Sequence, residues 1–245
     1  MTDETKSVMT RVRVRARWTR RELSRRLTRK LMLNPVTARS STRRAALVGP
    51  PDEWATQRRF QFEFLTSNGL RPEHRLLDIG CGTLRGGIPL IEYLDAGNYT
   101  GVEVRAAVLE EARKELAESG LADKEPVLIH AEDPAEIQSG DPFDLVWAFM
   151  VLIHMPDQVV DGYLRLVLQR MTESGEFYAN VALGDRADGE WQGFPVVFRP
   201  HEFYERTAAA HGLKMDEVGA LGSLGPHITS HGSRTMMLRF THASE

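Results

Sequence analysis

A glycine-rich stretch in the first half of the chain has the residue types and spacing of a nucleoside-binding site. The short apolar run Leu76–Ile79 contains Asp78 and breaks at Gly80-Cys81-Gly82. An apolar run bounded by glycines predicts a buried strand of a parallel sheet, and the glycines let the backbone approach a ligand closely. A second apolar run follows and carries Glu103 near its end. An acid in that place can accept hydrogen bonds from ribose hydroxyls.

The spacing of the glycines argues against a dinucleotide site. Glycines stand at 80, 82 and 86, so the third is one place later than in Gly-x-Gly-x-x-Gly. The carboxylate of Asp78 would repel a pyrophosphate, but it suits a cationic ligand that carries an amino group. An enzyme that uses NAD(P) also needs a hydride-handling pair such as Tyr-x-x-x-Lys, and the sequence contains no such pair.

Residues 75–104, RLLDIGCGTLRGGIPLIEYLDAGNYTGVEV, resemble the first motif of class I S-adenosylmethionine (SAM)-dependent methyltransferases. That motif is (D/E)-x-G-x-G, followed by an acid that ends the second strand. The stretch is also similar to a bacterial group with a GCG-x-LRGG loop, which is linked to saccharide and surface-polymer pathways. The His-Pro-Arg-Gly-Gln element of that group is matched only in part, at His231–Arg234. The resemblance covers residues 48–240 and implies that SAM is the cofactor.

The resemblance also implies where the cofactor is held. The first loop would contribute Asp78, Gly80, Cys81, Gly82 and Arg85, and Glu103 would bind the ribose. Glu132 or Asp133, after the third strand, would lie beside the adenine, although an acid pair there is equally typical of a helix N-cap. Phe149 ends the fourth strand, where the family places the sulfonium.

An aliphatic hydroxyl is a poor methyl acceptor until a base removes its proton, and histidine is the usual base at neutral pH. His154 follows the fourth strand directly and is the first candidate. His227 and His231, in the glycine-rich connection before the last strand, are the next, and His201 is a further one. The alternative for each is a packing or hydrogen-bonding role. A metal-assisted route through Asp157 or Asp161 stays an alternative, but their spacing is not a ligand signature and no metal ligand is assigned.

The acceptor is predicted to be a hydroxyl of a saccharide or another small polar metabolite. The sequence lacks (N/D)-P-P-(Y/F), which grips planar amines in methyltransferases of nucleobases. Methylation of an RNA or protein amine stays an alternative because the N-terminus is basic, and so does a non-catalytic SAM-binding protein. In the loop 184–195, Trp191 and Phe194 are expected either to stack on a substrate ring or to pack on the domain.

The elements that position these residues alternate between strands and helices. Strands are predicted at 76–79, 99–104, 126–131, 143–149, 176–183, 212–221 and 233–240. A helix from residue 52 to 67 carries aromatic residues that are expected in the core. The pattern and the resemblance predict an α/β fold, a Rossmann-like, doubly wound, seven-stranded sheet with an antiparallel last strand.

Charge divides the chain of 245 residues, whose net charge is −3. Residues 1–48 contain 14 Lys or Arg against three acids, a balance of +11, which leaves −14 for the remainder. We therefore predict a basic helical arm (1–48), joined through a linker at 40–51 to a methyltransferase domain (49–245). Leu23, Leu27 and Leu31 would share one helical face. The arm is expected to cover the domain's own acidic surface, or to contact an anionic surface, a nucleic acid or a second subunit, as in a homodimer.

The single cysteine fits a reducing cytoplasm. No apolar run approaches the roughly 20 residues of a membrane helix. We therefore expect a cytoplasmic protein without an integral membrane segment.

Overall fold

The computed structural model describes residues 40–137, 140–191, 194–225 and 235–243. The chain divides into two compact units, Met1–Asp52 and Glu53–Glu245. The predicted basic helix with Leu23, Leu27 and Leu31 lies outside the described residues. Within the linker predicted at 40–51, residues Ser40–Leu47 form helix α2. Its sequence, SSTRRAAL, is rich in alanine, arginine and leucine, which are strong helix formers.

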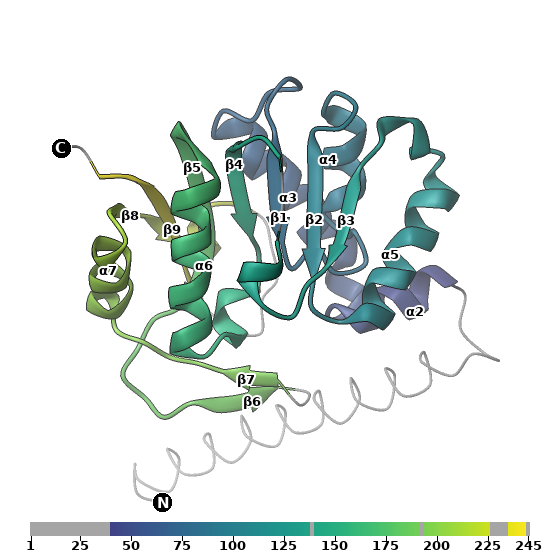
Figure 1. Ribbon diagram of the computed structural model, residues 1–245. Helices are drawn as coiled ribbons and strands as arrows, with labels where there is room; N and C mark the ends of the chain where they lie inside the picture. Colours follow the sequence, from purple (N-terminus) through teal and green to yellow (C-terminus); the bar gives the residue numbers. More distant parts are fainter. Residues whose placement is uncertain (1–39, 138–139, 192–193, 226–234, 244–245) are drawn as a thin grey trace, which may run out of the picture. The chain divides into compact units, whose positions relative to one another are not determined.

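One seven-stranded sheet organises the second unit, in the order β3-β2-β1-β4-β5-β9-β8 (Figure 1). Its strands are β1 (Leu76–Ile79), β2 (Tyr99–Glu103), β3 (Val127–His130), β4 (Phe143–Ala148), β5 (Met171–Ala182), β8 (Leu213–Ala220) and β9 (Thr235–His242). Strands β1 to β5 are parallel, and β9 is antiparallel to both β5 and β8. The Rossmann-like fold with an antiparallel last strand is therefore confirmed. The strand order reverses between β1 and β4, where such sheets bind ligands beyond the carboxyl ends of the strands.

Helices cover both faces of this sheet. They are α3 (Trp54–Ser67), α4 (Gly87–Tyr93) and α5 (Ala106–Ser119), which share one apolar cluster, and α6 (Asp157–Arg170) and α7 (His201–Ala210), which share the other. Strand β4 supplies both clusters by alternation, with Leu145 and Trp147 toward α3 and Val146 toward α6. The aromatic core predicted for the first helix is confirmed, since Phe60 and Phe64 are buried.

Short elements complete the connections. The 3-10 turns are η1 (Pro51–Glu53), η2 (Ala122–Lys124), η3 (Pro134–Glu136), η4 (Leu152–His154) and η5 (Leu221–Ser223). The segment predicted as an irregular loop at 184–195 instead contains a two-stranded hairpin, β6 (Gly189–Trp191) and β7 (Phe194–Val196). Figure 1 shows this hairpin at the end of the molecule where the parallel strands finish. Among the residues that the structure describes, no helix is long and apolar enough to cross a membrane.

Candidate functional site

The glycine loop after β1 is held tightly against its neighbours. Gly80 and Gly82 have φ angles of 73° and 59°, in the region that favours glycine. The amides of Gly80 and Cys81 donate to the carbonyl oxygen of Val102 in β2 at 2.8 and 3.0 Å. A Cβ on Gly80 would collide with the side chain of Val151. The loop therefore needs glycine both for its backbone angles and for the close packing of the segment after β4.

Asp78 lies beneath this loop as a buried carboxyl group. Only 4% of it is exposed, and its Oδ2 accepts a hydrogen bond from the Tyr99 hydroxyl at 2.6 Å. Burial raises the pKa of Asp78 to about 7, and the charge of Glu103 acts in the same direction. The Tyr99 hydrogen bond and the charge of Arg85 lower the pKa of Asp78, but they do not offset burial. Asp78 therefore changes charge near neutral pH.

Gln61 of α3 lies against the end of the loop, beside a second buried glutamine, Gln57, and neither was singled out in the sequence. Gln61 Oε1 accepts from the indole nitrogen of Trp147 at 3.1 Å, and Gln57 donates to Glu53 at 2.8 Å. A Cβ on Gly86 would collide with the Gln61 amide. The sequence pattern that could have identified them is a pair of glutamines four residues apart on an otherwise aromatic helix face.

Glu103 ends β2 beside the loop and is 4% exposed. Its Oε1 accepts from the main-chain nitrogen and from Nε of Arg105, at 3.0 and 2.9 Å. Oε2 accepts no hydrogen bond from the described part of the chain. One carboxylate oxygen is thus fixed by the protein, and the other is available to a hydroxyl donor.

The acid pair after β3 forms a helix cap. Asp133 Oδ1 accepts from the amide of Ala135 at 2.8 Å, and Glu136 accepts from the amides of Glu132 and Asp133. This is a capping box at the start of η3, so the N-cap alternative is confirmed. Glu132 and Asp133 are both exposed, and a contact with adenine stays a prediction.

Phe149, predicted beside the sulfonium, packs into the α3 side of the core. Its ring stacks on that of Trp147 with centroids 5.7 Å apart, and it is 6% exposed. Cys81, another predicted cofactor contact, is also buried. Its burial raises the pKa of the thiol, which disfavours a thiolate there. Cofactor contacts by these two residues stay predictions.

The segment that follows β4 is shaped by a buried asparagine of β5. Met150 has a φ of 59°, which is unusual for a residue with a side chain. Asn180, fully buried, accepts from the Met150 amide at 2.7 Å and donates to its sulfur at 3.2 Å. Sequence reasoning missed Asn180, whose only signal was a polar residue inside the apolar run FYANVAL. Its two bonds hold the turn that leads into η4 and His154.

His154 contacts the β6–β7 hairpin through its ring. Nδ1 lies 2.7 Å from the carbonyl oxygen of Pro195. Because a carbonyl only accepts, Nδ1 carries a proton, and the neutral ring has its lone pair on Nε2. Burial lowers the pKa of His154, and the charge of Arg105 lowers it further, against the effect of the Pro195 hydrogen bond. The ring of Phe194 lies 5.8 Å from the imidazole, between centroids.

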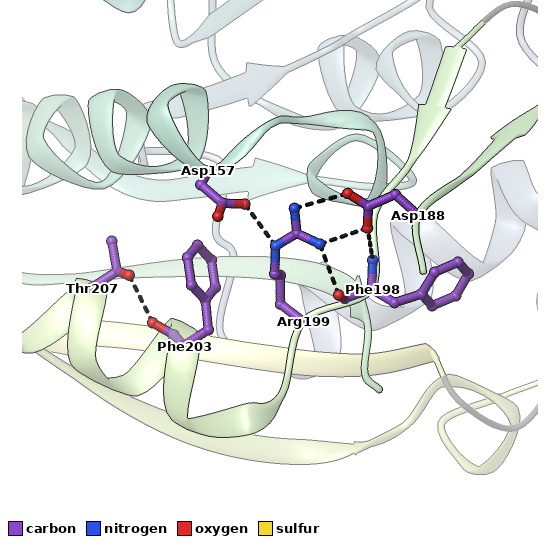
Figure 2. A network of polar contacts seen from close by, with 6 residues as sticks. All are labelled: Asp157, Asp188, Phe198, Arg199, Phe203 and Thr207. Carbon is purple, nitrogen blue, oxygen red and sulfur yellow. Dashed lines mark hydrogen bonds and ion pairs between the residues drawn. The ribbon is translucent and has the colours of Figure 1, made fainter. Parts of the chain in front are cut away.

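Arg199 anchors the chain that carries this hairpin (Figure 2). Its guanidinium makes two bonds to Asp188, at 2.6 and 3.0 Å, and one to Asp157 at the start of α6, at 2.7 Å. The Val197 amide also donates to the carbonyl of Ile153 at 2.9 Å. The hairpin is therefore attached to the segment that contains His154.

Of the four predicted bases, the structure describes His154 and His201. His227 and His231 are outside the described residues. His201 approaches Glu205 and Glu217, and His211 bonds Asp161 at 2.7 Å. Within the described ranges, no group of three His, Cys, Asp or Glu residues is arranged to hold a metal ion. Asp78 lies near the end of β1, Glu103 ends β2, and His154 lies in η4 after β4. The structure thus places all three at the carboxyl-terminal end of the parallel strands.

Sequence comparison finds methyltransferases. Residues 77–177 match the profile of a family described as a methyltransferase domain. Aklanonic acid methyltransferase of Streptomyces sp. (strain C5) is 34% identical over 117 residues, which cover 43% of this chain and 51% of that protein. The 27-O-demethylrifamycin SV methyltransferase of Amycolatopsis mediterranei is 36% identical over 92 residues, covering 36% of this chain and 32% of that protein. The chain thus spans about half or less of these relatives.

Solved structures agree on the fold. Magnesium protoporphyrin IX methyltransferase of Synechocystis, with bound S-adenosylhomocysteine (SAH), has a TM-score of 0.61 at 15% identity, and the match covers 89% of this chain and 99% of that chain. A SAM-dependent methyltransferase of Clostridium acetobutylicum has a TM-score of 0.59 at 14% identity, over 78% and 92% of the two chains. The sequence match over residues 77–177 and the fold are therefore both similar to those of methyltransferase domains.

Proposed function

We propose that this chain is a SAM-dependent O-methyltransferase that acts on a hydroxyl group of a small polar molecule. The single observation that carries the proposal is the meeting of Asp78, Glu103 and His154 at one edge of the sheet. Asp78 is the buried acid, Glu103 the proposed ribose acceptor and His154 the proposed base. All three lie within residues 77–177, the segment that matches the methyltransferase profile.

The residues present fit the cofactor. Gly80 and Gly82 give the loop its left-handed backbone angles, and Oε2 of Glu103 is available to ribose hydroxyls. The raised pKa of Asp78 shows that its carboxylate lacks sufficient compensation in the protein alone. A ligand with a positive amino group would supply that compensation. When bound, SAM supplies an electrophilic methyl group on a sulfonium.

His154 would act on the acceptor. Its Nε2 would take the proton of the acceptor hydroxyl and so make the oxygen nucleophilic toward the methyl group that bound SAM would supply. The hydrogen bond from Nδ1 to Pro195 fixes the tautomer that this role requires. The lowered pKa of His154 keeps the ring in its base form at neutral pH.

The acceptor is proposed to be a ring-bearing hydroxyl compound, either a saccharide or a small metabolite of the kind named in the relatives. Phe194 lies beside His154, where a flat side chain can stack on a ring. The relatives are named for aklanonic acid and 27-O-demethylrifamycin SV, and the GCG-x-LRGG loop supports a saccharide. A cytoplasmic location, suggested by the single cysteine, stays part of this proposal, and so do a homodimer and contact of the basic arm with an anionic surface or a second subunit.

Calorimetric binding of SAH and, separately, of NADPH tests the cofactor. SAH alone should bind in the micromolar range, and Glu103→Ala should weaken its binding by about 1–3 kcal/mol through lost hydrogen bonds to a charged acceptor. Glu110→Ala, which removes an exposed carboxylate of α5, is the matched control and should bind SAH as the wild type does. Binding of NADPH instead would overturn the proposal. If SAH binds, hydroxylated saccharides and aromatic hydroxyl compounds are the acceptors to screen.

A further inference from the structure

Arg105 connects the acid at the end of β2 with the hairpin above His154. Its main-chain nitrogen and its Nε both donate to Oε1 of Glu103. The centre of the same guanidinium lies 5.2 Å from the ring centroid of Phe194 in β7. The side chain of Glu103 is 4% exposed and that of Arg105 is 31% exposed, so this contact is partly shielded from water.

The contacts continue from Phe194 to the proposed base. The Phe194 ring lies beside the His154 imidazole, and the next residue, Pro195, accepts the Nδ1 proton. An unbroken series of contacts thus runs from the ribose acid through Arg105 and Phe194 to His154. Nothing in the proposed chemistry requires an arginine in that place, since the ribose needs only Glu103 and the acceptor needs only the base.

We propose that Arg105 is a positioning residue that couples cofactor binding at Glu103 to the placement of the β6–β7 hairpin over His154. This inference rests on the proposed function. A ribose hydroxyl that bonds Oε2 of Glu103 would order a carboxylate whose other oxygen is held by Arg105. The ordered guanidinium would then fix Phe194, so that the acceptor side of the site is completed after the cofactor has bound.

Coupling between two sites is reciprocal, which makes the inference measurable without a known acceptor. If bound SAH stabilises the contact between Arg105 and Phe194, then a change at Phe194 must weaken SAH binding. This holds although Phe194 lies on the hairpin and is not a proposed cofactor contact. A cation–π contact at a partly exposed site corresponds to about a 2- to 5-fold change in Kd.

The variants are Phe194→Leu, Arg105→Lys and the double substitution, each titrated with SAH by calorimetry. Leucine keeps an apolar side chain without a π face. Lysine keeps a charge for Glu103 but loses the planar group that stacks on the ring. Arg186→Gln is the matched control, because Arg186 lies 3.7 Å from the Phe198 ring centroid in the same connection and has no contact with Glu103. Thermal midpoints confirm that each variant is folded.

Each single variant should weaken SAH binding about 2- to 5-fold, and the double variant should lose no more than either one, because both remove the same contact. Arg186→Gln should bind SAH as the wild type does. Hydrogen exchange at the Val196 and Val197 amides should slow on SAH binding in the wild type and respond less in Arg105→Lys. Wild-type SAH affinity in Phe194→Leu, or additive losses in the double variant, would overturn the coupling. Failure of the wild type itself to bind SAH would instead overturn the proposed function on which the coupling rests.

Discussion

Replacing Asp78 with asparagine tests whether the glycine loop contains an uncompensated buried charge. The amide keeps an oxygen that can accept from the Tyr99 hydroxyl, but it cannot ionise. In the folded wild type the pKa of Asp78 is about 7, because burial disfavours the carboxylate, against 3.8 for an exposed aspartate. Between these values the folded chain holds a proton that the unfolded chain has lost, so the free energy of unfolding falls as the pH rises.

The size of the effect follows from the linkage slope. The contribution of Asp78 is fully present below pH 3.8 and is lost as the pH rises to about 7. Each pH unit inside this window changes the free energy of unfolding by about 1.4 kcal/mol. From about pH 5 to pH 8, the wild type should therefore lose roughly 3 kcal/mol relative to Asp78→Asn, because only the two units below pH 7 contribute.

Urea unfolding of both chains between pH 5 and pH 8 measures this difference. His154 titrates in both chains and cancels in the comparison. Arg85, whose pKa burial lowers to about 10, titrates above the window. Asp95→Asn, at an exposed aspartate, is the control and should show a difference from the wild type that is independent of pH. A difference between wild type and Asp78→Asn that stays constant over the range would refute the buried charge.

Two further predictions concern the base and the hairpin. His154→Ala should lower turnover about 10²–10⁴-fold with SAH affinity unchanged. In the wild type, the acid limb of kcat/KM should have its midpoint below 6.5, because the base must be neutral and its pKa is lowered. Near-normal turnover in His154→Ala would move the role to His227 or His231. Arg199→Met should speed hydrogen exchange at the β6–β7 hairpin, while the free energy of unfolding changes by only about 1 kcal/mol, because its ion pairs are partly exposed. An unchanged hairpin would show that the Val197 bond to Ile153 holds it alone.

Local sequence signals were sufficient for the parallel part of the sheet. Strand β1 was predicted with its observed bounds, and β2 and β4 were predicted to within one residue at their ends. These strands are short apolar runs bounded by glycines or charged residues, so their limits are present in the sequence itself. Strand β5 begins earlier than predicted, at Met171, because it pairs with Phe143 of β4. That pairing is a tertiary contact with no local signal.

The site was predictable where a single segment defines it. Asp78, the glycines and Glu103 lie in one βαβ unit, so their relative positions follow from the order of the elements. Asn180 and Arg199 act on residues far away in the sequence, and no spacing indicates either contact. Phe194 was singled out as an aromatic residue in a long loop, but its place beside Arg105 and His154 depends on the pairing of β6 with β7.

The two buried carboxyl groups of the site have different partners in the protein. Burial raises the pKa of Asp78 to about 7, although the Tyr99 hydroxyl donates a hydrogen bond that lowers it. Glu103 is equally buried, and the Arg105 guanidinium lies against one of its carboxylate oxygens. We therefore propose that these two carboxyl groups, at neighbouring strand ends, serve the cofactor differently. Glu103 is prepared to accept hydroxyl hydrogen bonds, whereas Asp78 gains its charge most readily when the ligand brings a cation.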